Sequence, residues 1–179
     1  MTVPRGVGPQ PSGYVLAPGE GTSAWFLTNR LTVKAGAEST GGRLTVIERR
    51  LQPGFGPPLH LHRDHDEALF VVEGSLLSML EGTTQQAPAG SFIFVPRGSE
   101  HTFHVQEGGI ARIIEIILPG GLEHYFLEGG RLATDDSVPT DFDPSDMDRI
   151  RALHDRYDSV HVGPPLAAGT ANGPMNKPD

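Results

Sequence analysis

Three histidines and one glutamate in the middle of the chain have the residue types and spacing of a metal site. His60 and His62 lie two residues apart in the short segment 59–62, and side chains alternate along a strand, so both imidazoles point to one face. Glu67 follows at the start of another apolar segment, and His101 comes from a later one. Imidazole nitrogens and a carboxylate oxygen suit divalent transition metals. These four residues therefore predict one site for a divalent ion.

Each of these residues is ordinary when taken alone, and the other histidines point to different roles. A His-X-His pair occurs by chance, and a glutamate at the start of a strand is usually solvated. His65 lies in a polar turn, where it usually faces water, but it is left open as an alternative ligand. His104 falls on the face opposite His101, which favours core packing or solvent. The remaining histidines show no ligand spacing: His124, His154 and His161.

Short apolar segments separated by glycine and proline must position the four residues. In 43–51 apolar and polar side chains alternate with period two, which is typical of a strand. We predict strands at 14–19, 24–28, 31–34, 43–51, 59–62, 67–73, 75–80, 91–95, 101–106 and 110–118, with a hairpin turn at 81–85. Residues 124–130 fit either a helical turn or a strand. Asp143 as a cap and Pro144 in the first turn predict a helix over 144–157. The predicted fold class is all-β with a short C-terminal helix.

Chain length and composition fit one domain and exclude several kinds of partner. We expect a loose arm at 1–13, a domain over 14–162 that includes the helix, and a disordered tail at 163–179. The net charge of −8 without a basic cluster argues against nucleic acid as a partner. No apolar run approaches membrane-spanning length, the start lacks a secretory signal, and there is no cysteine. We therefore expect no membrane partner and a cytoplasmic location.

The glycines around the four residues carry a family resemblance. The spacing runs Gly54-(five)-His60-X-His62-(four)-Glu67-(six)-Gly74, then Gly90-(five)-Pro96-X-Gly98-(two)-His101. This pattern resembles both conserved motifs of the cupin superfamily. The resemblance implies a jelly-roll barrel, also called a double-stranded β-helix, of two antiparallel sheets with the metal in its mouth. It implies His60, His62, Glu67 and His101 as the ligands. Val105 replaces the asparagine that usually closes the second motif, which predicts a more apolar cavity wall.

Looser matches in the flanks resemble single-domain cupins of the quercetin 2,3-dioxygenase-like type. They are Trp25-Phe26-Leu27, Pro57-Pro58-Leu59-His60, Asp66-Glu67, Val72-Glu73-Gly74, Pro119-Gly120-Gly121-Leu122-Glu123 and Val162-Gly163-Pro164-Pro165. This resemblance implies a dioxygenase that opens the ring of a flavonol or similar aromatic enol and releases carbon monoxide. Glu67 would then be both ligand and catalytic general base. The donor set accepts one ion of Ni, Mn, Fe, Co, Cu or Zn per chain.

Aromatic and sulfur-containing side chains are candidates for the substrate pocket, and two other functions stay open. The pocket candidates are Phe26, Phe55, Met79, Phe94 and Phe103, of which Phe103 shares the His101 face. The same site would suit a metal-dependent cyclase, isomerase or hydrolase on an aromatic or keto-enol metabolite. It would also suit a binding protein without catalytic activity. Residues 67–72 are apolar on both faces, and cupin barrels usually pair through outer sheet faces, so we expect a homodimer.

Overall fold

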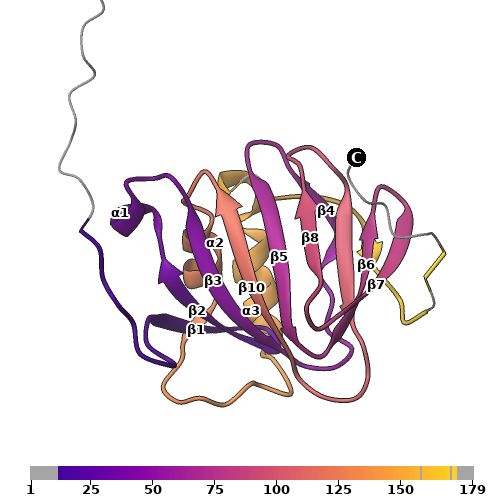
Figure 1. The fold of residues 1–179 in the computed structure, drawn as a ribbon, viewed down its shortest axis with the longest axis horizontal. Coiled ribbons are helices and arrows are strands. Elements are labelled where there is room, and N and C mark those ends of the chain that lie inside the picture. Colours follow the sequence, from indigo (N-terminus) through magenta and orange to yellow (C-terminus); the bar gives the residue numbers. More distant parts are fainter. Residues whose placement is uncertain (1–11, 158, 170, 173–179) are drawn as a thin grey trace, which may run out of the picture.

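Two antiparallel β-sheets facing one another make up most of the chain in the computed structural model, which describes residues 12–157, 159–169 and 171–172 (Figure 1). In this part of the chain the larger sheet has seven strands in the order β11-β1-β2-β3-β10-β5-β8. They are β1 (Thr22–Phe26), β2 (Asn29–Ala35), β3 (Thr45–Leu51), β5 (Asp66–Glu73), β8 (Phe92–Val95), β10 (Ala111–Leu118) and β11 (Arg131–Leu132).

The smaller sheet covers only part of the larger one, and helices cover the rest. Its strand order over the described residues is β12-β4-β9-β6-β7. They are β4 (Pro58–His62), β6 (Ser75–Leu80), β7 (Thr83–Pro88), β9 (His101–Val105) and β12 (Ser159–Pro165). The helices are α1 (Ala37–Thr40), α2 (Glu123–Gly129), α3 (Pro144–Arg151) and the 3₁₀ helix η1 (His154–Arg156). Figure 1 shows α2 and α3 behind the larger sheet, on the side where the smaller sheet lies.

Strand alternation builds the core from one face of each sheet. Along β3, alternate residues are buried, as period two predicts. One core cluster joins the larger sheet to α2 and α3; its largest members include Phe26, Leu31, Ile47, Ile117, Phe126 and Ile150. A second lies between the two sheets and includes Leu51, Leu69, Val71, Leu76, Phe103, Val105 and Ile113. Each fully buried aliphatic side chain stabilises the fold by roughly 1.5–3 kcal/mol.

Gly74 is a position in the first motif where only glycine fits. It joins β5 to β6 with φ at +77°, a left-handed conformation that side chains disfavour. A Cβ there would also lie 2.9 Å from the Cα of Ala111. The turn therefore lets the chain pass from β5 in the larger sheet to β6 in the smaller one while it packs against the start of β10.

The structure confirms the all-β class with short helices, and it differs from the predicted elements at several points. Residues 14–17 form no strand, and β7 begins at Thr83, which shortens the predicted 81–85 turn. Residues 123–129 are helical. The helix predicted over 144–157 ends at Arg151 and is followed by a separate 3₁₀ turn. Asp143 caps it by accepting a hydrogen bond from the backbone N–H of Ser145.

The predicted tail does not begin at residue 163, because β12 continues to Pro165. Prolines fit there because β12 is an edge strand, which leaves one side of its backbone without a ladder partner. Further on, the backbone N–H of Asn172 donates to the hydroxyl of Thr84 at 2.9 Å. The rest of the predicted tail, 173–179, and most of the predicted N-terminal arm, 1–11, lie outside the described residues. Within the described part of the chain, no helix has the length and apolar character needed to cross a membrane.

Candidate metal centre and its cavity

Three strands bring four side chains with metal-binding atoms to one point. His60 and His62 come from β4, His101 from β9, and Glu67 from β5 in the opposite sheet. One nitrogen or oxygen atom of each lies within 4.8 Å of the matching atoms of the others. Of the residues that the structure describes, these four alone form such a group. The structure therefore brings together the four residues that the sequence selects.

The β4–β9 pairing fixes the histidine rings against one another. His60 stands directly opposite His101 in the register of these strands, and their ring centroids are 4.2 Å apart. The ring of His62 lies 5.0 Å from that of His60 because both project from the same face of β4. The loop before β9 is tied to β4 as well, since the N–H of Gly98 donates to the carbonyl oxygen of His62 at 2.7 Å. Strand pairing and this loop contact together hold the imidazoles in place.

Two of the rings are held in an orientation that suits a metal ligand. The Nδ1 of His60 lies 2.8 Å from the carbonyl oxygen of Pro58, and the Nδ1 of His101 lies 3.0 Å from that of Ser99. A carbonyl oxygen only accepts, so both Nδ1 atoms carry hydrogen and a neutral ring keeps the lone pair on Nε2. Metal-binding histidines are commonly oriented by such a contact on the other ring nitrogen. The residues present therefore fit a divalent ion.

The electrostatics of the four residues favour a cation between them. Burial, followed by the charges of His101 and His62, lowers the pKa of His60 to about 3, so its ring is neutral at pH 7. Burial opposes the ionisation of Glu67, but the hydrogen bond from His101 and the charges of both histidines outweigh it and lower its pKa. The Nε2 of His101 lies 3.0 Å from the Oε2 of Glu67. Burial lowers the pKa of His101, yet this contact outweighs it and raises the pKa. Glu67 is thus a buried carboxylate that needs a positive partner.

A second buried carboxyl group, Glu115, lies behind Glu67 and was missed by the sequence analysis. Burial raises the pKa of Glu115, Arg49 partly opposes this, and the charge of Glu67 and its hydrogen bond add to the rise, which brings the pKa to about 8. Arg49 lies 3.2 Å from the Oε2 of Glu115 and 3.3 Å from the Oδ1 of Asn29. The guanidinium also stacks over the Phe126 ring at 4.8 Å. The sequence did carry a signal that Arg49 and Glu115 are buried, because strand alternation places each of them on the same face as apolar residues, Ile47 in β3 and Ile113 in β10.

A small cavity opens beside the four residues and lies where the two core clusters meet. Its volume is about 100 Å³. Three of the five candidates for the substrate pocket, Phe26, Phe55 and Phe103, line it together with Tyr125 and Phe126. Burial raises the pKa of Tyr125 to about 12, so this phenol is neutral at pH 7.

Two of the predicted pocket residues lie elsewhere. Phe94 is 52% exposed on the outer face of β8, because only the opposite face of that edge strand turns toward the core. Met79 lies on β6 opposite Thr102 and does not line the cavity. Val105 is fully buried in the cluster between the sheets, so it adds to the core and not to the cavity wall. The ring of His65 is 6.3 Å from that of His62, and His65 is outside the group of four.

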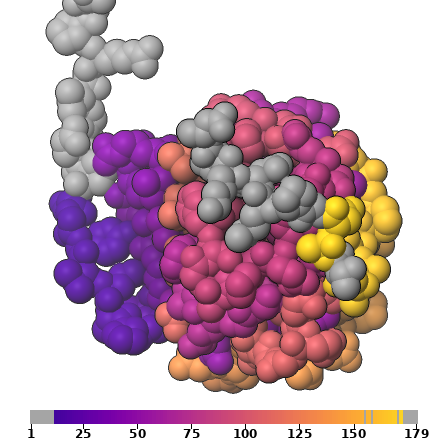
Figure 2. All heavy atoms as spheres, turned by 45° about the vertical axis from the view of Figure 1, so that its right-hand side comes forward, coloured from indigo at the N-terminus to yellow at the C-terminus, as the bar shows by residue number. Residues whose placement is uncertain are grey.

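The C-terminal part of the chain also reaches the cavity. Met147 and Ile150 of α3 line it, as do Ser159 and His161 of β12. β12 pairs with β4, and His161 lies opposite His60 with a ring-centroid distance of 6.4 Å. In Figure 2 the C-terminal segment, in yellow, lies along the side of the barrel. His161 has no ligand spacing in the sequence; the strand pairing alone places it beside the site.

Comparison with known proteins gives a family match that includes all four residues. Residues 47–117 match the family described as Cupin domain. The chain is 28% identical over 113 residues to quercetin 2,3-dioxygenase of Bacillus subtilis (strain 168), which covers 63% of this chain and 33% of that protein. It is 30% identical over 92 residues to the tetracenomycin polyketide synthase protein TcmJ of Streptomyces glaucescens, covering 51% of this chain and 60% of that protein. The chain thus spans less than two thirds of the length of either relative.

A solved structure supports the same fold. The predicted oxalate decarboxylase of Thermotoga maritima matches with a TM-score of 0.56 at 17% identity, over 59% of this chain and 99% of that one. Two facing antiparallel sheets, the matched motifs and this structural likeness agree. Residues 47–117 therefore match the cupin domain family, and the described part of the chain has the fold of this solved structure.

Proposed function

We propose that this protein is a metal-dependent dioxygenase that acts on an aromatic enol, either a flavonol or a similar compound. The observation that carries the proposal is the place of Glu67, which is 5% exposed and lies among three histidines at the wall of an aromatic-lined cavity. The similarity to quercetin 2,3-dioxygenase of Bacillus subtilis supports it. We propose His60, His62, Glu67 and His101 as ligands of one divalent ion, whose identity the donor set leaves open among Ni, Mn, Fe, Co, Cu and Zn.

The residues of the chain would divide the work as follows. A divalent ion held by the four residues supplies Lewis acidity, which makes a nearby hydroxyl group more acidic. Glu67 accepts the proton of the substrate hydroxyl, as a catalytic base within reach of the cavity. Glu115, through its hydrogen bond, holds the Glu67 carboxylate from behind. Phe55, Phe103 and the other rings flank the substrate and exclude water.

Oxygen consumption tests this function directly. We expect the metal-loaded protein to consume one molecule of dioxygen for each enol molecule in an oxygen-electrode assay with a panel of one-ring and three-ring enols. The panel is repeated with each of the six metals, because the reaction depends on the ion. An absence of oxygen uptake with every enol and every metal would contradict the dioxygenase proposal.

A cyclase or another non-oxidative reaction on an aromatic polyketide is the second candidate. The similarity to the polyketide synthase protein TcmJ favours it. The same metal would polarise a carbonyl oxygen while Glu67 moves a proton, and no dioxygen would be needed. Product formed under nitrogen at the rate seen in air would decide for this reaction and against the dioxygenase. Binding of enols without any product would instead indicate a protein that only binds small molecules.

We also propose that two copies pair through the outer face of β5 and β8. Phe70, Phe92 and Phe94 are 42%, 63% and 52% exposed there, and Phe70 lies directly opposite Phe92. Three neighbouring exposed rings are a costly surface in water unless a partner covers them. Light scattering at micromolar concentration should give about twice the 19.2 kDa chain mass, and Phe92→Lys should return the mass to that of one chain. A single-chain mass for the unaltered protein would refute the pairing.

A further inference from the structure

Two parts of the chain form the wall of the cavity: the barrel and a C-terminal cap. We define the cap as α3 (Pro144–Arg151) and β12 (Ser159–Pro165). Met147 and Ile150 of the cap line the cavity together with barrel residues such as Phe55 and Phe103. Ile150 is 4% exposed and belongs to the core cluster of α2 and the larger sheet. The cap is thus a wall of the cavity, and its side chains occupy space that a ligand could use.

The space that the barrel and the cap leave open in the cavity is large enough only for a compact ligand. The cavity measures about 100 Å³. An engineered apolar cavity of ~150 Å³ accommodates one benzene ring, and pockets for drug-sized ligands usually measure ~300–1,000 Å³. A single enol ring therefore needs only small side-chain adjustments, whereas a three-ring flavonol needs the cap wall to give way.

The contact between α2 and α3 resists such a movement. A Cβ at Gly129 of α2 would lie 2.8 Å from the Phe26 ring and 3.2 Å from Ile150, so the helices meet at a distance that only glycine allows. The Nε of Arg149 donates to the carbonyl oxygen of Gly129 at 3.0 Å. Arg149 also pairs with the buried Asp146 at 2.6 Å. On its other side the cap is held by the pairing of β12 with β4.

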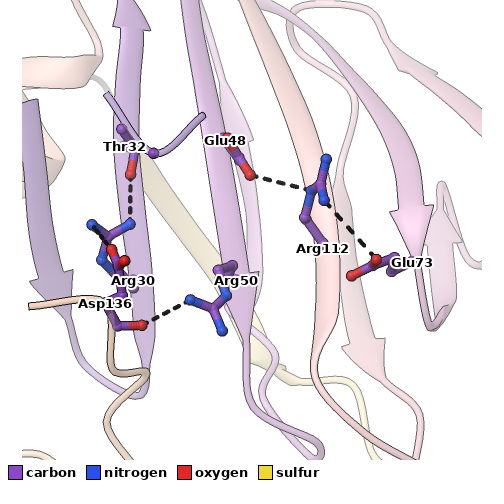
Figure 3. Close-up of a pocket in the computed structure, with 8 residues that line it drawn as sticks. Arg30, Thr32, Glu48, Arg50, Glu73, Arg112 and Asp136 are labelled. Carbon is purple, nitrogen blue, oxygen red and sulfur yellow. Dashed lines mark hydrogen bonds and ion pairs between the residues drawn. The ribbon is translucent and has the colours of Figure 1, made fainter. Parts of the chain in front are cut away.

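The connection that leads into α3 is fastened to the barrel as well. We call residues 133–143 the strap. Side chains from β1, β2 and β3 and from the residue after β3 donate hydrogen bonds to four of its carbonyl oxygens: Trp25 to Ser137, Arg30 to Asp135, Arg50 to Asp136 and Gln52 to Val138. Figure 3 shows Arg30 and Arg50 meeting Asp136, where the Asp136 carboxylate also pairs with Arg30 at 2.9 Å. The hollow drawn there thus contains two of the four side chains that anchor the strap, Arg30 and Arg50.

We propose that the cap sets the size of the substrate, and that Met147 is the specificity-determining residue that limits it to compact, single-ring enols. This inference rests on the proposed function and narrows its substrate class. Met147 is the better probe of the two helix residues, because it is half-buried while Ile150 is part of the core. A shorter side chain at position 147 takes atoms away from the cavity wall but none from the core cluster. The space beside the four residues therefore grows while the fold is kept.

Binding of two enols of different size tests the proposal without relying on turnover. The full chain is loaded with Zn²⁺, which is redox-inert. A one-ring hydroxypyranone and the three-ring 3-hydroxyflavone are then titrated by calorimetry. We expect the pyranone to bind at least about tenfold more tightly, a difference of about 1.4 kcal/mol. Met147→Ala should tighten the flavone and remove most of this difference, whereas Met147→Trp should weaken both ligands.

The matched control is Met79→Ala, a half-buried methionine on β6 that does not line the cavity. It should leave the ratio of the two affinities unchanged. Equal affinities in the unaltered protein, no binding of the pyranone, or a Met147→Ala ratio equal to that of Met79→Ala would overturn the proposal. Failure of the dioxygenase proposal would look different. In that case the two enols would bind with the expected size preference, but no enol would support oxygen uptake.

Discussion

Replacing Glu67 by alanine is expected to abolish turnover while part of the metal stays bound. A positioned general base contributes about 10²–10⁴-fold to a rate, and the same change removes the negative charge that balances the ion. Three imidazoles remain, and His60 and His101 keep their carbonyl contacts, so metal affinity falls without vanishing. Oxygen uptake and metal content, measured on the same sample, separate the two effects.

The control for this variant is Glu107→Gln, which removes a carboxylate from an exposed turn. It should retain the rate and the metal content of the unaltered protein. Glu67→Gln adds a finer comparison, because the amide keeps the shape of the side chain but is a far weaker base. A fully active Glu67→Ala would overturn the role of Glu67 as a base. Loss of all metal would assign the effect to ligation alone.

Replacing His62 by alanine is expected to weaken metal binding strongly. The side chain is 6% exposed and its Nε2 lies 3.7 Å from the Oε2 of Glu67. Loss of a partner outside the ligand shell already costs about 10–100-fold in affinity, so loss of a ligand should cost more than about 100-fold. At a metal concentration 1,000 times the dissociation constant, binding should stabilise the unaltered protein by about 4 kcal/mol and raise Tm by roughly 8–16 °C.

For His62→Ala a site weakened about 100-fold leaves about 1.4 kcal/mol of stabilisation at the same metal concentration, so the rise in Tm should fall to about 3–6 °C or less. His124→Ala is the matched control, because that side chain is 44% exposed and lies outside the group of four. It should show the full rise in Tm. A similar rise in both variants would show that His62 is not a ligand.

The candidate metal site was predictable from sequence because its geometry follows from local rules. Strand alternation alone places His60 and His62 on one face, and the glycine spacing places the turns. The contact with Glu115 was not predictable in this way, because it depends on β10 and β5 being neighbours in the sheet. Nothing local in the sequence fixes that pairing.

The misplaced elements have a similar cause. Phe94 has the residue type of a pocket aromatic, but β8 is an edge strand whose outer face carries Phe92 and Phe94. The sequence 163–165 has the glycine and prolines of a tail, yet pairing with β4 makes it a strand. In both cases the tertiary environment overrides the preference of the residues.

The position of the cap in the chain has a consequence for how the protein is made. All four candidate ligands lie between residues 60 and 101, whereas the cap begins at Pro144. A ribosome adds about 5–20 residues per second, so the ligand strands emerge seconds before the helix and strand that cover them. During synthesis the four candidate ligands are therefore translated before the cap that forms part of the cavity wall. An ion that enters at that stage meets an open barrel, and the cap, which is translated later, closes over it.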